Sequence, residues 1–271
     1  MSAAPINTPT ENDLLVPFEQ QNIPAEYREY YQIRRGNFFS SIQRFSEIWR
    51  HYMLLDKIWL REFEDLKPSI DLDRAFPLTL FMNAHAKVRI SIELAFSGCM
   101  AEARSIMRDA IEFVALAHHM LKDHEYQKIW LSKNDDQDAF DEQFWDAKRT
   151  RLFAGLDELY KVWCQLSETG SHANLNAMCD RSVIVKSETH VELRLNYTGL
   201  DEKMWATSLF SLLLNCFKME ETLFKDYRTR FQFDGGLLSM RGEFDRHKEQ
   251  LRWTLVKRYD LKPPESAVAI P

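Results

Sequence analysis

Apolar residues recur every three or four positions along most of the chain, which is the pattern of amphipathic helices. The longest such stripe, between residues 37 and 67, predicts one helix long enough to span a domain. It consists of Phe38, Ile42, Phe45, Trp49, Tyr52, Leu55, Trp59, Phe63 and Leu66. Pro68 ends this helix, because proline disfavours a helical residue before it. A shorter helix over 25–35 precedes it, and we expect a bend near Gly36.

Two further helices, over 76–97 and 99–122, are separated only by Ser97 and Gly98 and predict an antiparallel αα-hairpin. Pro77 suits the first turn of the 76–97 helix. N–H groups in a first turn have no partner within the helix, so the missing N–H of proline costs nothing there. Capping boxes beginning at Asn134 and Thr198 mark two later helix starts. The remaining stripes predict helices over 123–134, from 134 to about 153, over 156–169, from Asp201 to about 227, and over 240–259.

One segment alternates apolar and polar residues, as a half-buried strand does. It runs from Val191 to Tyr197, and Arg181–Lys186 is a β-branched candidate partner. A lone hairpin is marginally stable, so we expect its apolar face to rest on the helices. The predicted fold is therefore all-α: an antiparallel bundle of seven or eight helices with one small β-hairpin near 181–197.

No internal repeat or Gly/Ser linker divides the chain, which predicts one helical domain at 24–260. An extended N-terminal arm (1–23) precedes it and a flexible tail (261–271) follows. The 271 residues suffice for a sizeable core, and only 8 Gly and 9 Pro argue against collagen or a turn-rich β-sandwich.

Charge and cysteine usage narrow the class of protein. The net charge of -6 argues against a globally basic nucleic-acid binder. No window reaches the ~20 apolar residues of a membrane span, and the first residues lack the pattern of a signal peptide. The 4 cysteines are scattered without a CxxC pair, which indicates reduced thiols. We therefore expect a cytoplasmic protein without membrane association.

Complementary charges lie on the two helices that flank Gly98. His85, Arg89 and Glu93 follow one line on the first helix, and the second carries another line at the same spacing, formed by Arg104, Arg108 and Glu112. In an antiparallel hairpin we expect Glu93 near Arg104, and Arg89 near Glu112 or Asp109. One interpretation is a structural network of ion pairs that fixes helix register. The other is an anion site in which Arg108 binds phosphate, with Arg89 and Arg104 as further binding residues.

A second polar cluster comprises Tyr160, Ser167 and His172, around a predicted helix end at Gly170. A histidine there is favoured as a cation by the helix dipole, which is a structural role. The alternative is a general acid or base that reaches into a cleft.

Sequence motifs for cofactors are absent. The chain has no HExxH, P-loop or GxGxxG pattern, and its histidines and cysteines lack zinc-finger spacing. We therefore expect no metal and no cofactor.

Two short motifs resemble the HEPN-like group of bacterial helical proteins, over about residues 80–225. They are GCMAEARSIMRDAIE, from Gly98 to Glu112, and YKVWCQLSETGSH, from Tyr160 to His172. The resemblance implies a helical bundle, frequent homodimers, and links to RNA cleavage, toxin–antitoxin pairs or phage defence. Arg108, Glu112 and His172, from the two polar clusters above, are the candidate catalytic residues. The family's ribonuclease motif, Arg-x4–6-His, is matched formally by Arg44 and His51, in the first long helix and outside that segment.

The sequence leaves two functions of different class open. The first is a non-catalytic interaction or regulatory protein that forms a homodimer or binds a protein partner, with Phe39, Ile48 and Trp130 beside the main stripes as candidate surface residues. The alternative is a metal-independent ribonuclease or nucleotide-binding enzyme, with the mildly basic segment Lys225–Lys262 contacting RNA or nucleotide phosphates.

Overall fold

The structure, a computed structural model, describes residues 24–66, 72–144, 152–170, 182–186, 190–195, 201–229 and 231–261. Its elements are α1 (Ala25–Arg44), α2 (Ser46–Leu66), α3 (Leu72–Phe96), α4 (Met100–Lys122), α5 (His124–Leu131), α6 (Gln137–Phe144), α8 (Asp157–Gly170), β1 (Ser182–Lys186), β2 (Val191–Leu195), α10 (Glu202–Arg228) and α11 (Gly235–Tyr259). The predicted all-α class is confirmed. The described ranges contain nine helices rather than seven or eight.

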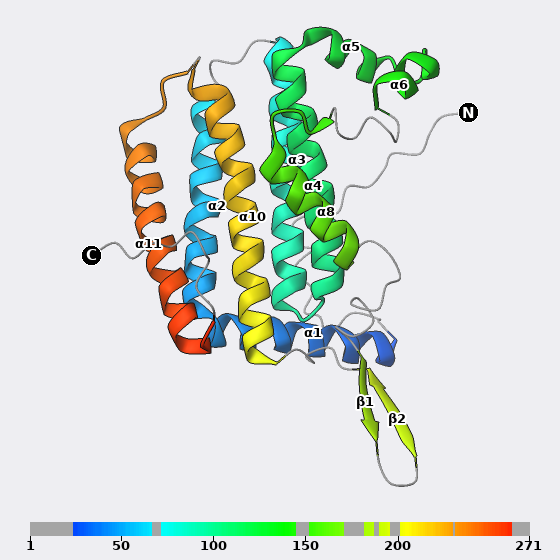
Figure 1. Cartoon of the computed structure of the whole chain (residues 1–271), viewed down its shortest axis with the longest axis vertical. Coiled ribbons are helices and arrows are strands. Elements are labelled where there is room, and N and C mark those ends of the chain that lie inside the picture. Colours follow the sequence, from blue (N-terminus) through cyan, green and yellow to red (C-terminus); the bar gives the residue numbers. More distant parts are fainter. Residues whose placement is uncertain are drawn as a thin grey trace.

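The five longest helices lie side by side and form the bundle (Figure 1). They are α2, α3, α4, α10 and α11. Helix α8 packs on α4, α1 crosses one end of the bundle, and α5 and α6 lie at the other end. Helix α11 lies at the outer edge against α2. This arrangement leaves α1 and α11 each with one face away from the core.

The core is built from the inward stripes of α2, α3, α4 and α10, with further buried residues from α8 and α11. Each large apolar side chain that becomes fully buried contributes roughly 1.5–3 kcal/mol to the free energy of unfolding. The largest of them include Trp59, Phe81, Phe96, Met107, Ile111, Leu209, Tyr227 and Phe244.

The α3–α4 hairpin forms as predicted. Gly98 has a φ of 87°, in the left-handed region that favours glycine. The N–H of Cys99 donates to Leu94 O at 2.8 Å, and that of Gly98 donates to Ala95 O at 3.2 Å. This pair of bonds is the Schellman motif, which ends a helix and reverses the chain.

The predicted bend at Gly36 is wrong. Helix α1 continues through Gly36 to Arg44, and the chain turns at Phe45, which has a non-helical φ of -112° and ψ of 39°. Phe45 is buried in the core and its ring packs on Trp205. Burial of this ring places α1 across the bundle end, whereas Gly36 lies on an open helix surface and imposes no bend.

Helix starts also differ from the predicted capping boxes. Asp136 Oδ1 accepts from the N–H of Ala139 at the start of α6, and Asp201 Oδ1 accepts from that of Met204 at the start of α10. The side chains that cap these helices are therefore Asp136, in place of Asn134, and Asp201, whereas Thr198 lies outside the described residues. Helix α3 begins at Leu72, so Pro77 lies inside it rather than in its first turn.

Strands β1 and β2 pair antiparallel, with Ile184 opposite Leu193. The hairpin extends beyond α1, away from the long helices, instead of lying along them (Figure 1). Residues Arg181, Asn196 and Tyr197 of the predicted strands lie outside the described residues.

Candidate functional site

The charge pairing predicted across the α3–α4 hairpin is wrong. Arg89 turns to α2, where its Nε and Nη2 donate to both carboxylate oxygens of Asp56 at 2.8 and 2.7 Å. Glu93 lies 3.7 Å from Arg34 of α1. The ion pair that does join α3 to α4 is Lys87 with Asp109, at 3.5 Å. Arg89 and Glu93 therefore lie on a different face of the hairpin from the α4 charges.

The predicted α4 line of Arg104, Arg108 and Glu112 faces α8 and α10. Arg108 Nη2 donates to Glu112 Oε1 at 3.0 Å, and Trp163 Nε1 of α8 donates to the same oxygen at 2.8 Å. The Arg108 guanidinium also lies 5.3 Å from the centre of the Trp163 ring. Arg104 Nη2 donates to Ser208 Oγ of α10 at 3.3 Å. These contacts fasten α4 to its neighbours, which is a structural use of the predicted catalytic pair Arg108 and Glu112.

The second predicted cluster is brought together only in part. The ring of Tyr160 stacks on Trp163 at 6.2 Å, and a hydrogen bond with Cys164 raises the pKa of the Tyr160 hydroxyl. Ser167 Oγ donates to the backbone oxygen of Trp163 at 2.8 Å. His172 lies outside the described residues. Tyr160 thus joins the Arg108 cluster through stacking, while the Ser167 hydroxyl is used within its own helix.

A triad of the buried Asp56 and His85 with the exposed Arg89 was missed by sequence reasoning. His85 Nε2 lies 2.7 Å from Asp56 Oδ1. Burial alone raises the pKa of Asp56, but the hydrogen bonds from Arg89 and His85 outweigh it and hold this pKa below its ordinary value. The available signal was an acidic residue at a buried position of the α2 stripe, with two basic residues one turn apart on α3.

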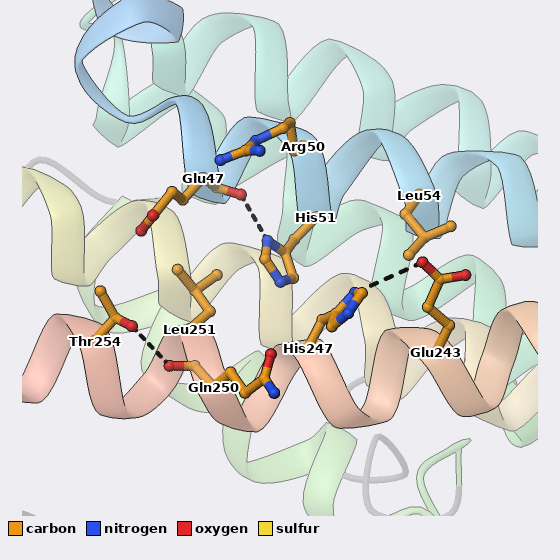
Figure 2. Close-up of a pocket in the computed structure, with 9 residues that line it drawn as sticks. All are labelled: Glu47, Arg50, His51, Leu54, Glu243, His247, Gln250, Leu251 and Thr254. Carbon is orange, nitrogen blue, oxygen red and sulfur yellow. Dashed lines mark hydrogen bonds and ion pairs between the residues drawn. The ribbon is translucent and has the colours of Figure 1, made fainter.

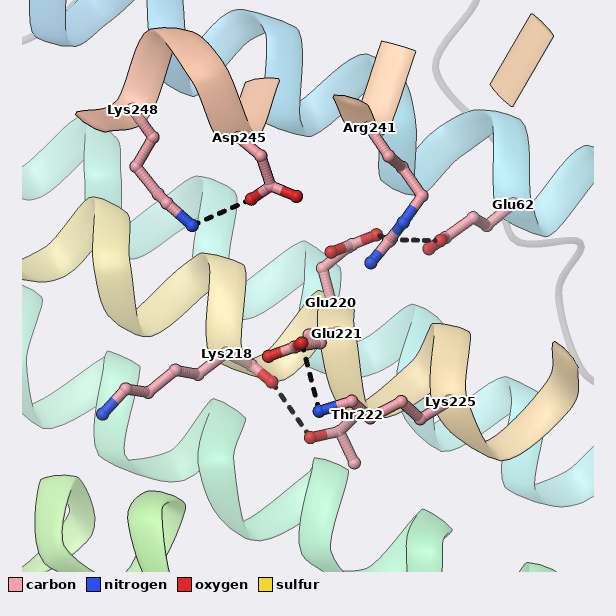
Figure 3. Close-up of polar contacts among 9 residues, drawn as sticks. All are labelled: Glu62, Lys218, Glu220, Glu221, Thr222, Lys225, Arg241, Asp245 and Lys248. Carbon is pink, nitrogen blue, oxygen red and sulfur yellow. Dashed lines mark hydrogen bonds and ion pairs between the residues drawn. The ribbon is translucent and has the colours of Figure 1, made fainter. Parts of the chain in front are cut away.

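A second buried network joins α2, α10 and α11 (Figure 3). Arg241 Nη1 contacts Glu62 Oε1 at 2.9 Å and also contacts Glu220, and both glutamates are fully buried. The Arg241 guanidinium lies 3.7 Å from the ring centre of Phe224. Two acids share one cation here. Burial raises the pKa of Glu62 from 4.5 to about 8, although Arg241 opposes the shift.

A groove between α2 and α11 encloses about 440 Å³ (Figure 2). His51 of α2 and His247 of α11 face each other across it, with ring centres 6.1 Å apart. His51 Nδ1 lies 2.6 Å from the backbone oxygen of Glu47, and His247 Nδ1 lies 3.8 Å from Glu243 Oε1. The formal Arg-x6-His match contributes its histidine to this groove, whereas Arg44 pairs with Glu202 at 3.0 Å.

Helix α1 exposes large apolar side chains. Tyr27, Tyr31 and Phe39 are spaced by four and eight residues, with Arg35 between the last two. The Arg35 guanidinium lies 5.8 Å from the Phe39 ring centre. We call these four residues the α1 stripe. A hollow of about 400 Å³ lies between its Tyr31, Arg35 and Phe39 and the end of α3.

Neither a transmembrane helix nor a gathered metal-ligand set occurs in the part of the chain that the structure describes. None of its helices combines the length and apolar character needed to cross a bilayer. No three or more His, Cys, Asp or Glu side chains are grouped to hold an ion. Cys99, Cys164 and Cys216 are free thiols.

Comparison with known proteins gives no further constraint: no family model, curated protein or solved structure matches the chain.

Proposed function

We propose that this chain is a non-catalytic helical interaction protein that forms a homodimer through the α1 stripe. The observation that carries the proposal is the exposure of three aromatic rings on one helix. Tyr27 is 61% exposed and Phe39 is 53% exposed. Tyr, Phe and Arg are enriched at protein interfaces, and an exposed apolar cluster of this kind is typical of a docking surface.

The stripe suits a second copy of the same chain. Tyr31 and Phe39 each lie four residues from Arg35, so the pattern reads alike in both directions. A two-fold axis near Arg35 brings Tyr31 of one copy against Phe39 of the other, twice. The rings supply the apolar contact, and the two Arg35 side chains approach each other near the axis. Their repulsion lowers the affinity and makes it depend on salt.

The low burial of α1 also favours docking of a second copy on this helix. Ser41 is the residue of α1 that is fully buried, and the rest of this helix lies half-exposed or exposed over the bundle end. Of the three surface residues expected from the sequence, Phe39 is exposed. Ile48 is in the core, and Trp130 is half-buried and packs on Phe76.

Catalysis at the predicted residues has less support. Arg108, Glu112 and Trp163 bind one another, so the Arg108 guanidinium is already committed to contacts between α4 and α8. We therefore do not advance the ribonuclease alternative for these residues. A cytoplasmic location and a toxin–antitoxin or phage-defence setting complete the proposal. Free thiols support the former, and the HEPN-like resemblance of 98–112 and 160–172 supports the latter.

The experiment is light scattering of the purified chain over a range of concentrations. We expect the wild type to approach twice the monomer mass, Phe39→Glu and Tyr31→Glu to stay monomeric, and Arg35→Gln to dimerise more tightly than the wild type. Trp253→Glu on α11 is the matched control, because Trp253 and Tyr31 are equally exposed at 46%. A wild type that is monomeric at all concentrations, or stripe variants that dimerise like the control, would reject the proposal.

A further inference from the structure

The groove between α2 and α11 contains the same short pattern twice. Glu47 and His51 are four residues apart on α2, and Glu243 and His247 are four residues apart on α11. The glutamates lie at opposite ends of the groove, with the two imidazoles between them (Figure 2). Neither the fold nor the α1 stripe uses these four residues.

The hydrogen bonds orient the His51 ring toward a ligand. A backbone carbonyl only accepts, so the Nδ1–H of His51 donates to Glu47 O at 2.6 Å. This leaves the lone pair on His51 Nε2, a buried atom that has no hydrogen-bond partner in the described chain. Histidines that bind metal ions characteristically donate their second N–H to a carbonyl or carboxylate, as His51 does here. His247 Nδ1 lies 3.8 Å from Glu243 Oε1, which is longer than a hydrogen bond.

The spacing of the rings suits one shared ion. A metal–nitrogen bond of about 2.0–2.1 Å places the ion roughly 3.2 Å from an imidazole centre, so two rings on one ion lie up to about 6.4 Å apart. The observed separation between the His51 and His247 ring centres is 6.1 Å. An approach of roughly 1 Å by the two rings gives the tetrahedral angle that zinc prefers.

The charge of the groove selects a cation over an anion. Glu47 and Glu243 carry two negative charges, and Arg50 is the one lysine or arginine among the described lining residues. The described chain gathers no group of three or more His, Cys, Asp or Glu side chains. The site therefore has two protein donors, the imidazoles of His51 and His247, and water fills the remaining positions. Imidazole donors favour zinc, copper or nickel over magnesium or calcium.

We propose that the α2–α11 groove is a binding site for a divalent transition-metal ion of the zinc class, held by His51 Nε2 and His247 Nε2. Glu47 orients the His51 ring through its backbone oxygen, and the Glu243 carboxylate lies 3.8 Å from His247 Nδ1. The site joins α11 to α2 at the outer edge of the bundle, so a bound ion stabilises the docking of α11 against the bundle.

The test is calorimetric titration of tag-free protein with Zn²⁺, Ni²⁺ and Mg²⁺ separately. We expect Zn²⁺ and Ni²⁺ to bind at one ion per chain and Mg²⁺ not to bind. His247→Ala and His51→Ala should each abolish that binding, and Glu243→Gln should weaken it by about 10-fold or more. His124→Ala, at an exposed histidine on α5, is the matched control and should bind like the wild type.

Thermal unfolding with and without Zn²⁺ gives a second readout. Zn²⁺ should raise the Tm of the wild type and of His124→Ala and leave that of His247→Ala unchanged. Because His247 is half-exposed, its alanine variant should fold, and its ellipticity without metal checks this. The proposal is overturned if the wild type binds neither Zn²⁺ nor Ni²⁺, if His247→Ala binds Zn²⁺ like the wild type, or if Mg²⁺ binds equally well.

Discussion

Arg89 of α3 holds Asp56 of α2 through two parallel hydrogen bonds, of 2.8 and 2.7 Å, and does not contact the charges of α4. Asp56 is buried and also contacts His85, whereas the Arg89 side chain is 49% exposed. The pair therefore anchors α3 to α2 from the edge of the core. The hairpin at Gly98 is instead held by its turn and by apolar packing, with Lys87–Asp109 as an outer ion pair.

Removing Asp56 should lower the free energy of unfolding more than removing Arg89 does. Asp56→Ala removes the hydrogen-bond partner of both the buried His85 and Arg89, and we expect it to lower the free energy of unfolding by about 2–3 kcal/mol. Arg89→Ala should cost less, about 1–2 kcal/mol, because the Asp56 carboxylate keeps its hydrogen bond with His85. Urea denaturation followed by circular dichroism measures both.

The control for this pair is Asp109→Ala, which removes a partially exposed ion pair with Lys87. Its cost should be at most about 1 kcal/mol. A loss for Asp56→Ala no greater than that of Asp109→Ala would contradict the anchoring role of Asp56.

Two glycine substitutions should have opposite signs. Gly98 has a positive φ, so Gly98→Ala should destabilise the protein by about 1–2 kcal/mol. Gly36 lies inside α1 with no atom near a Cβ, so Gly36→Ala should stabilise the protein by about 0.5–1 kcal/mol. Thermal and urea unfolding of the two variants test this directly, and equal effects would refute the turn geometry assigned to Gly98.

The stability of the protein should fall as pH rises through the neutral range. Burial raises the pKa of Glu62 from 4.5 to about 8, so the folded chain binds a proton that the unfolded chain has released. The stabilisation is complete below pH 4.5 and is lost as pH approaches 8, on the order of 5 kcal/mol. Glu62→Gln should flatten this decline and exceed the wild type in stability at pH 8.

The matched control for Glu62 is Glu221→Gln, on the neighbouring α10. Glu221 is partly exposed and pairs with Lys225 at 3.1 Å, so its substitution should leave the pH profile unchanged. Unfolding measured at intervals from pH 5 to 8.5 compares the three proteins. A Glu62→Gln profile parallel to that of the wild type would show that Glu62 is not the group that binds the proton.

Local chemistry allowed much of the fold to be predicted. The spacing of the apolar residues is enough to define most helices, and Gly98 marks a turn because its signal lies within a few residues. The turn at Phe45 was not predicted, because it depends on Trp205, which lies far along the chain. A stripe that continues through a turn looks the same in sequence as one that continues along a helix.

The candidate sites were harder to predict, for the same reason. The charges of Arg89 and Glu93 follow a clear line, but their partners are set by which helix packs on that face of α3. Asp56 is 33 residues from Arg89, and Glu62 is 179 residues from Arg241. Helical periodicity tells which residues share a face and does not tell which other helix covers it.

Site-specific photocrosslinking tests the dimer proposal most directly. Phe39 is replaced by p-benzoylphenylalanine, the protein is irradiated, and the linked peptides are identified by mass spectrometry. The α1 stripe predicts a crosslink between two chains, from position 39 to residues around Tyr31 of the second copy. Recovery of uncrosslinked monomer alone, or of crosslinks between two chains that join position 39 to helices other than α1, would contradict it.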